Sequence, residues 1–258
     1  MNRIRRNWIG LATLVNKEVV RIFRIWSQTL VPPAITMSLY FVIFGNVIGS
    51  RVGKMSGFSY MAYIAPGLIM MSIIQNSYSN VVSSFFGAKF ARHVEEILVS
   101  PLPLSLLLLG YMAGGMVRGL LTGALVTLVA LFFTHLEPAE PLVIVSVAIL
   151  TSAIFSLAGF TNAIFAKKFD DISIVPTFVL TPLTYLSGVF YPIALLPPFW
   201  RDLSQIDPIV YMVSAFRTGI LGIRTMPLMT AYGFMIIFLL FLFGMNWWLL
   251  KRGIGIRN

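Results

Sequence analysis

The sequence contains no cysteine, and among its 258 residues only two are histidine and nine are aspartate or glutamate. Without cysteine the chain can form no disulfide, no thiolate metal site and no cysteine nucleophile. The two imidazoles, His93 and His135, lie far apart in the sequence. The H-E-x-x-H motif of zinc enzymes and the G-x-S-x-G motif of serine hydrolases are also missing. We therefore assign no catalytic residue and no metal ligand, and an enzyme is the weakest candidate function.

Charge is equally scarce. Charged residues make up 11% of the sequence, against about 25% in soluble globular proteins. Hydrophobic residues make up 58%, and the mean hydropathy is +0.87. This composition predicts a polytopic membrane protein. The net charge of +10 would also suit nucleic acid, but the basic residues cluster beside apolar runs, as membrane orientation requires. We expect membrane lipid around the chain and no nucleic acid.

Residues 1–24 precede the first long uncharged run and lack the features of a cleavable signal. At helical spacing they separate into an apolar and a basic stripe. The apolar stripe holds Trp8, Leu11, Val15, Val19, Ile22 and Trp26, and the basic stripe holds Arg3, Arg6, Lys17, Arg21 and Arg24. Such a pattern predicts an interfacial amphipathic helix on the membrane surface, over residues 1–27, with its cations toward anionic lipid.

Six apolar runs follow, each long enough to cross a bilayer, and only the third contains a charged residue. They cover residues 28–48, 60–85, 110–133, 142–166, 172–195 and 228–250. We predict an all-α membrane protein with six transmembrane helices in a single domain, 1–258. Basic residues lie before the first run, after the last, and in the second and fourth connections, whereas the third connection carries only Glu137 and Glu140. The positive-inside rule therefore predicts that both termini are cytoplasmic.

The fifth run is broken by prolines and by Gly188. Pro176 and Pro182 remove backbone donors, so the carbonyls that they free need partners within the protein. The stretch 196–227 is too short for two crossings, and it predicts short helices on the outer membrane surface. Asp207 and Pro208 are suited to the cap and the first turn of one of these helices.

The residue order in this region resembles the signature of ABC-2 type transport permeases. The matching residues are Leu180, Leu183, Leu186, Ser187, Val189, Leu196, Pro197, Pro208, Ile209, Tyr211 and Arg217. Segments 30–46 and 166–178 are also similar to YadH-type permeases of bacterial inner membranes. With the topology above, the signature region becomes a candidate outer gate comprising Pro182, Ser187, Gly188, Tyr191, Pro192, Pro197, Trp200, Pro208, Tyr211 and Arg217.

The resemblance implies an exporter permease that works as a dimer with two separate cytoplasmic ATPase subunits. ATP and Mg²⁺ would bind to those subunits, since this chain has no G-x-x-x-x-G-K-[ST] phosphate loop and binds no cofactor of its own. Residues 87–103 predict a short amphipathic helix, which is either a coupling element or a solvated turn, and the resemblance favours coupling. The resemblance implies an acidic contact in this connection, which would be Glu95 or Glu96. The ATPase-coupling candidates in this segment are Lys89, Arg92, Glu95, Glu96, Leu98 and Pro101. Asp170 and Asp171 form a second candidate contact, and the alternative is that these two carboxylates are only solvated at the membrane edge.

Gly115, Gly119 and Gly123 give the third run a smooth face, which predicts close helix packing inside the subunit. Arg118 lies in this run as an intramembrane charge, either functional or snorkelling. An ion-coupled carrier or a passive channel is the alternative function. Carriers hold acidic or imidazole groups within the membrane, whereas all nine acidic residues here can be placed at or outside the span boundaries. We therefore favour the ATP-driven permease.

Overall fold

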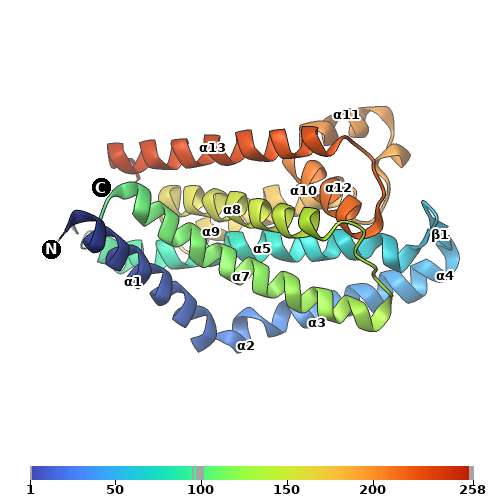
Figure 1. Cartoon of the computed structure of the whole chain (residues 1–258), viewed down its shortest axis with the longest axis horizontal. Coiled ribbons are helices and arrows are strands. Elements are labelled where there is room, and N and C mark those ends of the chain that lie inside the picture. The colour runs from blue at the N-terminus through green and yellow to red at the C-terminus, as the bar shows by residue number, and fades with distance from the viewer. Residues whose placement is uncertain (1, 95, 97–101, 256–258) are drawn as a thin grey trace.

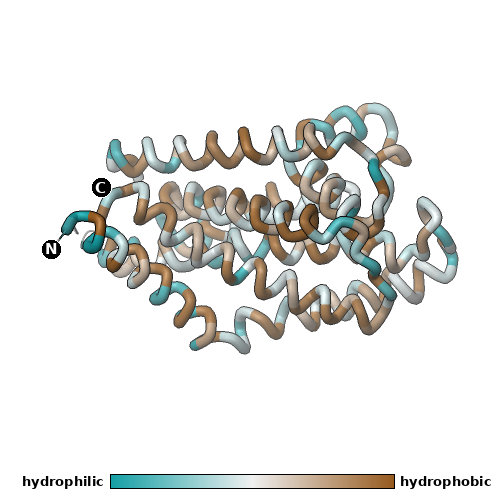
Figure 2. The backbone as a smooth tube through the Cα atoms, in the orientation of Figure 1, coloured by the Kyte–Doolittle hydropathy of each residue, from teal (hydrophilic) through white to brown (hydrophobic). Residues whose placement is uncertain are grey.

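A computed structural model describes the chain except for residues 1, 95, 97–101 and 256–258. Long helices form a bundle whose axis runs horizontally in Figure 1. We call the end at which α1 begins and α13 ends the terminal end, and the end that carries α4, β1 and α11 the distal end. Apolar residues dominate the middle of the long helices, and polar residues gather in the distal connections and along α1 (Figure 2).

The N-terminal half contains α1 (Arg3–Arg24), α2 (Trp26–Thr29), α3 (Val31–Tyr40), the π-helical η1 (Phe41–Ile48), α4 (Gly49–Val52), α5 (Tyr60–Phe90) and α7 (Leu104–Phe133). Two short strands, β1 (Lys54–Met55) and β2 (Phe58–Ser59), pair antiparallel just before α5. The C-terminal half contains α8 (Pro141–Phe165), α9 (Asp171–Val175), the π-helical η2 (Pro176–Leu180), α10 (Thr181–Leu186), the 3₁₀ turn η3 (Ile193–Leu195), α11 (Pro198–Ile206), α12 (Pro208–Leu221) and α13 (Leu228–Arg252).

The predicted helical class is confirmed, with the small hairpin as the one addition among the described residues. The segments 26–52, 104–133, 141–165 and 228–252 are long and apolar enough to cross a membrane. α5 is the central helix, packed against α7, α8 and α12 and buried along most of its length. The interfacial position of α1 and the count of six spans stay predictions.

Helix α5 is central because α7 approaches it closely. A Cβ atom on Gly123 would lie 2.6 Å from Cγ1 of Ile73, and one on Gly119 would lie 3.1 Å from the Ile73 carbonyl oxygen. The glycine face of α7 is therefore an internal packing surface, as its spacing predicts.

The prolines interrupt the fifth run in the expected way. Pro176 cannot donate to the carbonyl oxygen of Ile172, and Nδ2 of Asn162 in α8 donates to that oxygen instead, at 3.2 Å. The helical stretch ends at Leu186 and not at 195. The reason is Gly188, whose φ of 77° leaves the helical region.

Candidate functional site

The signature region folds at the distal end around Arg217 of α12. This side chain is 4% exposed. Its guanidinium donates to the carbonyl oxygens of Gly188 at 2.7 Å and Val189 at 3.4 Å, and it lies 4.2 Å from the ring centroid of Tyr63 in α5. Arg217 thus joins α12, α5 and the turn after α10, and its charge is balanced by carbonyl dipoles and an aromatic face.

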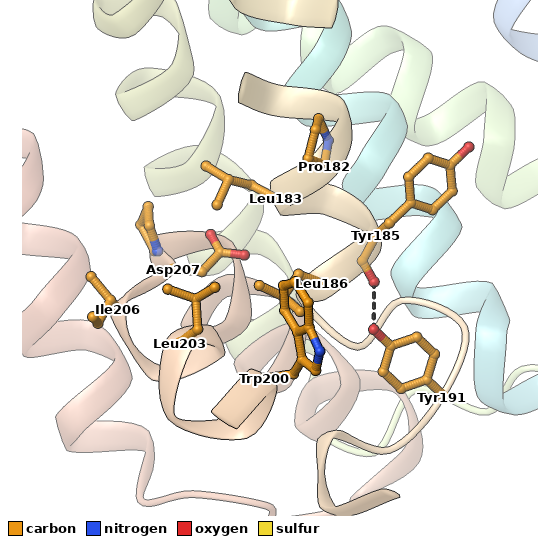
Figure 3. A pocket seen from close by; sticks show the side chains of 10 residues that line it. Pro182, Leu183, Tyr185, Leu186, Tyr191, Trp200, Leu203, Ile206 and Asp207 are labelled. Atoms are coloured by element: carbon orange, nitrogen blue, oxygen red, sulfur yellow. Dashed lines mark hydrogen bonds between the residues drawn. The ribbon is translucent and has the colours of Figure 1, made fainter. Parts of the chain in front are cut away.

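Beside this turn, α10 and α11 enclose a pocket of about 600 Å³. Its lining is Pro182, Leu183, Tyr185, Leu186, Tyr191, Trp200, Leu203, Ile206, Asp207 and Pro208 (Figure 3). The Tyr191 hydroxyl donates to the Tyr185 carbonyl oxygen at 2.8 Å and fixes one wall. The side chains that line the pocket are apolar apart from the Asp207 carboxyl group, the indole N–H of Trp200 and the two tyrosine hydroxyls.

Asp207 caps α12, as its sequence position predicts. Its Oδ1 accepts the backbone N–H of Ile209 at 2.9 Å. The residue is 2% exposed, and its Oδ2 has no hydrogen-bond partner among the described residues. Burial raises the pKa of this carboxyl to about 7, and the hydrogen bond from Ile209 lowers the pKa by less than burial raises it.

The other signature residues have local structural roles. Pro182, Tyr191, Trp200 and Pro208 line the pocket. The Tyr211 hydroxyl donates to the Gln205 carbonyl oxygen at 2.9 Å and fixes the α11–α12 corner, and the Ser187 hydroxyl donates to the Thr184 carbonyl oxygen at 2.8 Å. Pro192 and Pro197 precede η3 and α11 respectively.

At the terminal end, two connections that are far apart in the sequence meet. Lys89, near the end of α5, donates to the carbonyl oxygens of Ile164 at 2.6 Å and Ala166 at 2.8 Å, which close α8. The ring of Phe169 packs 4.8 Å from that of Phe90. The connection after α5 and the connection after α8 therefore form one surface.

The coupling candidates have different environments on this surface. Arg92 and Glu96 are exposed, and Arg92 has a φ of 59°, where the chain turns away from α5. Asp171 accepts the backbone N–H groups of Lys167 at 2.8 Å and Lys168 at 3.0 Å, and these bonds lower the pKa of its carboxyl. Asp170 is exposed. Glu95, Leu98 and Pro101 lie outside the described residues.

A buried polar cluster joins α1 to the bundle, and the amphipathic pattern gave no sign of it. Glu18 is 0% exposed, and it accepts the Ser84 hydroxyl at 2.6 Å and the Arg21 guanidinium at 3.0 Å. Arg21 also donates to Oδ1 of Asn80 at 2.9 Å. Arg21 is thus half-buried within the protein and does not face lipid as the basic stripe predicts. In the sequence, Gly114 of α7 could have indicated this close contact. A Cβ atom on Gly114 would lie 2.6 Å from that of Glu18.

Arg118 also turns inward, and its guanidinium donates to Oδ1 of Asn76 at 3.3 Å. The residue is half-buried, which agrees with pairing inside the bundle. Across the described residues, no three His, Asp or Glu side chains come together as a metal site.

The bundle of membrane-length apolar helices, with its proline-interrupted fifth segment and the distal turn held by Arg217, defines a helical membrane protein. A model of the ABC-2 type transporter family matches residues 10–221, so the chain belongs to this family. It is 56% identical over 251 residues to the inner membrane transport permease YadH of Escherichia coli (strain K12). The aligned residues cover 97% of this chain and 98% of that protein.

More distant relatives cover most of the same chain. Nodulation protein J of Rhizobium leguminosarum bv. trifolii is 26% identical over 215 residues, 83% of this chain and 82% of that protein. Nodulation protein J of Sinorhizobium fredii (strain NBRC 101917 / NGR234) is 28% identical over 185 residues, 71% and 70% of the two chains. The membership of the family makes this chain the permease component of an ABC transport system.

Proposed function

We propose that this chain is the permease subunit of an ATP-driven exporter in the inner membrane. Two copies would act with two separate ATP-binding subunits, which carry the ATP and Mg²⁺. The terminal end would be cytoplasmic and would bind the ATPase, and the distal end would face outward and act as the gate. Substrate would then leave through the distal end.

The observation that carries this proposal is the composite surface at the terminal end. A partner that moves on ATP hydrolysis needs a rigid surface that connects to more than one helix. Lys89 and Phe169 join the ends of α5 and α8, so a force on Arg92, Glu96 or Asp170 reaches both helices. Exposed charges of both signs suit recognition of a soluble protein partner.

The α1 cluster supports the same reading. Glu18, Arg21, Asn80 and Ser84 tie α1 to α5 next to the glycine face of α7. A displacement of α1 at the terminal end would therefore move the two helices that form the centre of the bundle.

Co-purification of the chain with a separately expressed ABC ATPase tests the proposal. Glu96→Arg combined with Asp170→Lys should reduce complex formation and permease-stimulated ATP hydrolysis, because both changes reverse exposed charges on the composite surface. Glu137→Lys is the matched control, since it reverses an exposed charge in the connection 134–140 at the distal end.

Loss of the complex in the double variant alone supports the assignment of the surface and of the cytoplasmic end. An equal loss in Glu137→Lys, or an unaffected double variant, contradicts it. Export by the reconstituted permease without any ATPase would contradict the proposed function as a whole.

A further inference from the structure

The distal pocket combines a large apolar volume with one acceptor that has no partner. Its volume of about 600 Å³ lies within the ~300–1,000 Å³ range of pockets that bind small molecules. Figure 3 shows the Asp207 carboxyl group between Leu183 of α10 and Leu203 of α11. Oδ1 caps α12, and Oδ2 has no partner in the part of the chain that the structure describes, so an incoming donor has a single oxygen to bind.

The tyrosine hydroxyls of the lining and the nearby Arg201 already have hydrogen-bond partners. The Tyr191 hydroxyl is bonded to the Tyr185 carbonyl oxygen, and the Tyr185 hydroxyl lies 3.2 Å from that of Tyr40. Arg201, in α11, donates to the carbonyl oxygens of Ala194 and Leu196. Among the described residues, no basic side chain lines the pocket, so none of them supplies a cation to Asp207 from the lining.

We propose that this pocket binds amphiphiles that carry a protonated amine on an alkyl or ring body. The ammonium group would donate to Oδ2 of Asp207, and the apolar body would contact Leu183, Leu186, Leu203 and Trp200. A metal ion does not suit the site, because Ca²⁺ and Mg²⁺ need about six oxygen ligands and the pocket offers one free carboxylate oxygen. A neutral alcohol would fill the same volume but would lack the charge that a buried carboxylate favours.

The exposed rim supports an apolar body. Trp200 is 48% exposed and Ile206 is 74% exposed, and both belong to the lining. An exposed apolar rim of this kind suits the apolar body of an amphiphile, which collects at membrane surfaces. The proposed binding does not depend on the direction of transport or on its source of energy.

Quenching of tryptophan fluorescence by a brominated ligand tests the site. The full chain would be placed in phosphatidylcholine nanodiscs at about pH 8, where the Asp207 carboxyl is ionised and an alkylamine is still protonated. It would be titrated with ω-bromododecylamine and, separately, with ω-bromododecanol. Trp200→Phe identifies the part of the signal that comes from the pocket, because the other tryptophans lie in α1, α2 and α13. We expect a saturable, Trp200-dependent signal with the amine.

Asp207→Asn is the decisive variant. Its amide oxygen can still accept the Ile209 N–H, so α12 keeps its cap, but the charge is lost. The affinity for the amine should fall by about tenfold or more, while the affinity for the alcohol should stay within about twofold of the wild-type value. Asp202→Asn removes an exposed carboxylate from α11, the helix that ends just before Asp207, and should leave both affinities unchanged.

Three outcomes would overturn the proposal. The first is an amine affinity in Asp207→Asn equal to that of the wild type. The second is an equal loss in Asp202→Asn, which would indicate general surface charge. The third is the absence of a saturable signal that depends on Trp200. Circular dichroism of each variant verifies that the helical fold is retained.

Discussion

The carbonyl oxygen of Gly188 accepts a hydrogen bond of 2.7 Å from the guanidinium of Arg217, which lies 29 residues further along the chain. Gly188 has a φ of 77°, so its backbone can turn this oxygen inward at the end of α10. The fully buried Tyr63 ring lies beneath the same guanidinium. One side chain therefore fixes the distal turn relative to the central helix.

Replacing Arg217 by lysine should destabilise the protein by about 1–3 kcal/mol. An ammonium group lacks the planar fork that reaches both carbonyl oxygens, and it leaves at least one buried acceptor without a donor. Thermal unfolding in detergent measures the loss. Arg224→Lys is the control, since its side chain is 71% exposed in an ion pair with Glu140. Equal melting temperatures for wild type and Arg217→Lys would contradict this role.

Gly67→Ala should also damage the distal turn. A Cβ atom on Gly67 would lie 2.8 Å from the carbonyl oxygen and 2.9 Å from the Cα atom of Val189. Backbone atoms cannot rotate away, so the turn must shift, at a cost of about 1–3 kcal/mol.

The matched control for this change is Gly233→Ala in α13, which has no neighbour within 4 Å of the new methyl group. Alanine there should stabilise the helix by about 0.5–1 kcal/mol. The two variants should therefore shift the melting temperature in opposite directions, and a shift in the same direction would show that the close approach at Gly67 is unimportant.

Glu18→Gln should destabilise the protein by about 2 kcal/mol, because it leaves the Arg21 guanidinium without its carboxylate in a buried cluster. This figure is below the ~3–5 kcal/mol cost of breaking a fully buried pair, since the Arg21 side chain is 26% exposed. Glu140→Gln breaks an ion pair of the same kind between exposed groups and should cost less than about 1 kcal/mol. Chemical denaturation of both variants measures the difference, and equal costs would contradict the importance of burial.

Stability should depend on pH through Asp207. Burial raises the pKa of its carboxyl to about 7, so between about pH 4 and pH 7 the folded protein holds a proton that the unfolded chain releases. This contribution to stability is complete below about pH 4 and is lost as the pH rises through 7. Within the described residues, the pocket lining contains no other carboxyl group and no basic group, and its other titratable groups are Tyr185 and Tyr191. Arg201 of α11 and Tyr211 of α12 lie on the neighbouring elements.

Asp207→Asn has no proton to lose at this position. Its melting temperature minus that of the wild type should therefore be greater at about pH 8 than at about pH 5. Asp202→Asn, which changes an exposed carboxylate in the preceding helix α11, should show no such trend. A constant difference between Asp207→Asn and the wild type across this range would contradict the raised pKa.

The sequence by itself determined the features that depend on nearby residues. The apolar runs predict α7, α8 and α13, because each charged residue placed in hydrocarbon is unfavourable by itself, whatever the rest of the fold. Asp207 followed by Pro208 begins α12, because a cap bond reaches only two residues ahead. The glycine spacing of α7 predicts a close helix contact, and the prolines predict the break before α10.

Only the tertiary structure decided which polar groups are buried and which partners they have. Glu18 lies among other charged residues of α1, and its neighbours in the sequence do not mark it as buried. It is buried because Gly114 lets α7 approach it and Ser84 of α5 supplies a donor. Lys89 binds the end of α8, more than 70 residues away. Asp207 becomes a lone acceptor in an apolar pocket because α10 and α11 close around it. Such pairings depend on elements distant in the sequence, so no local pattern determines them.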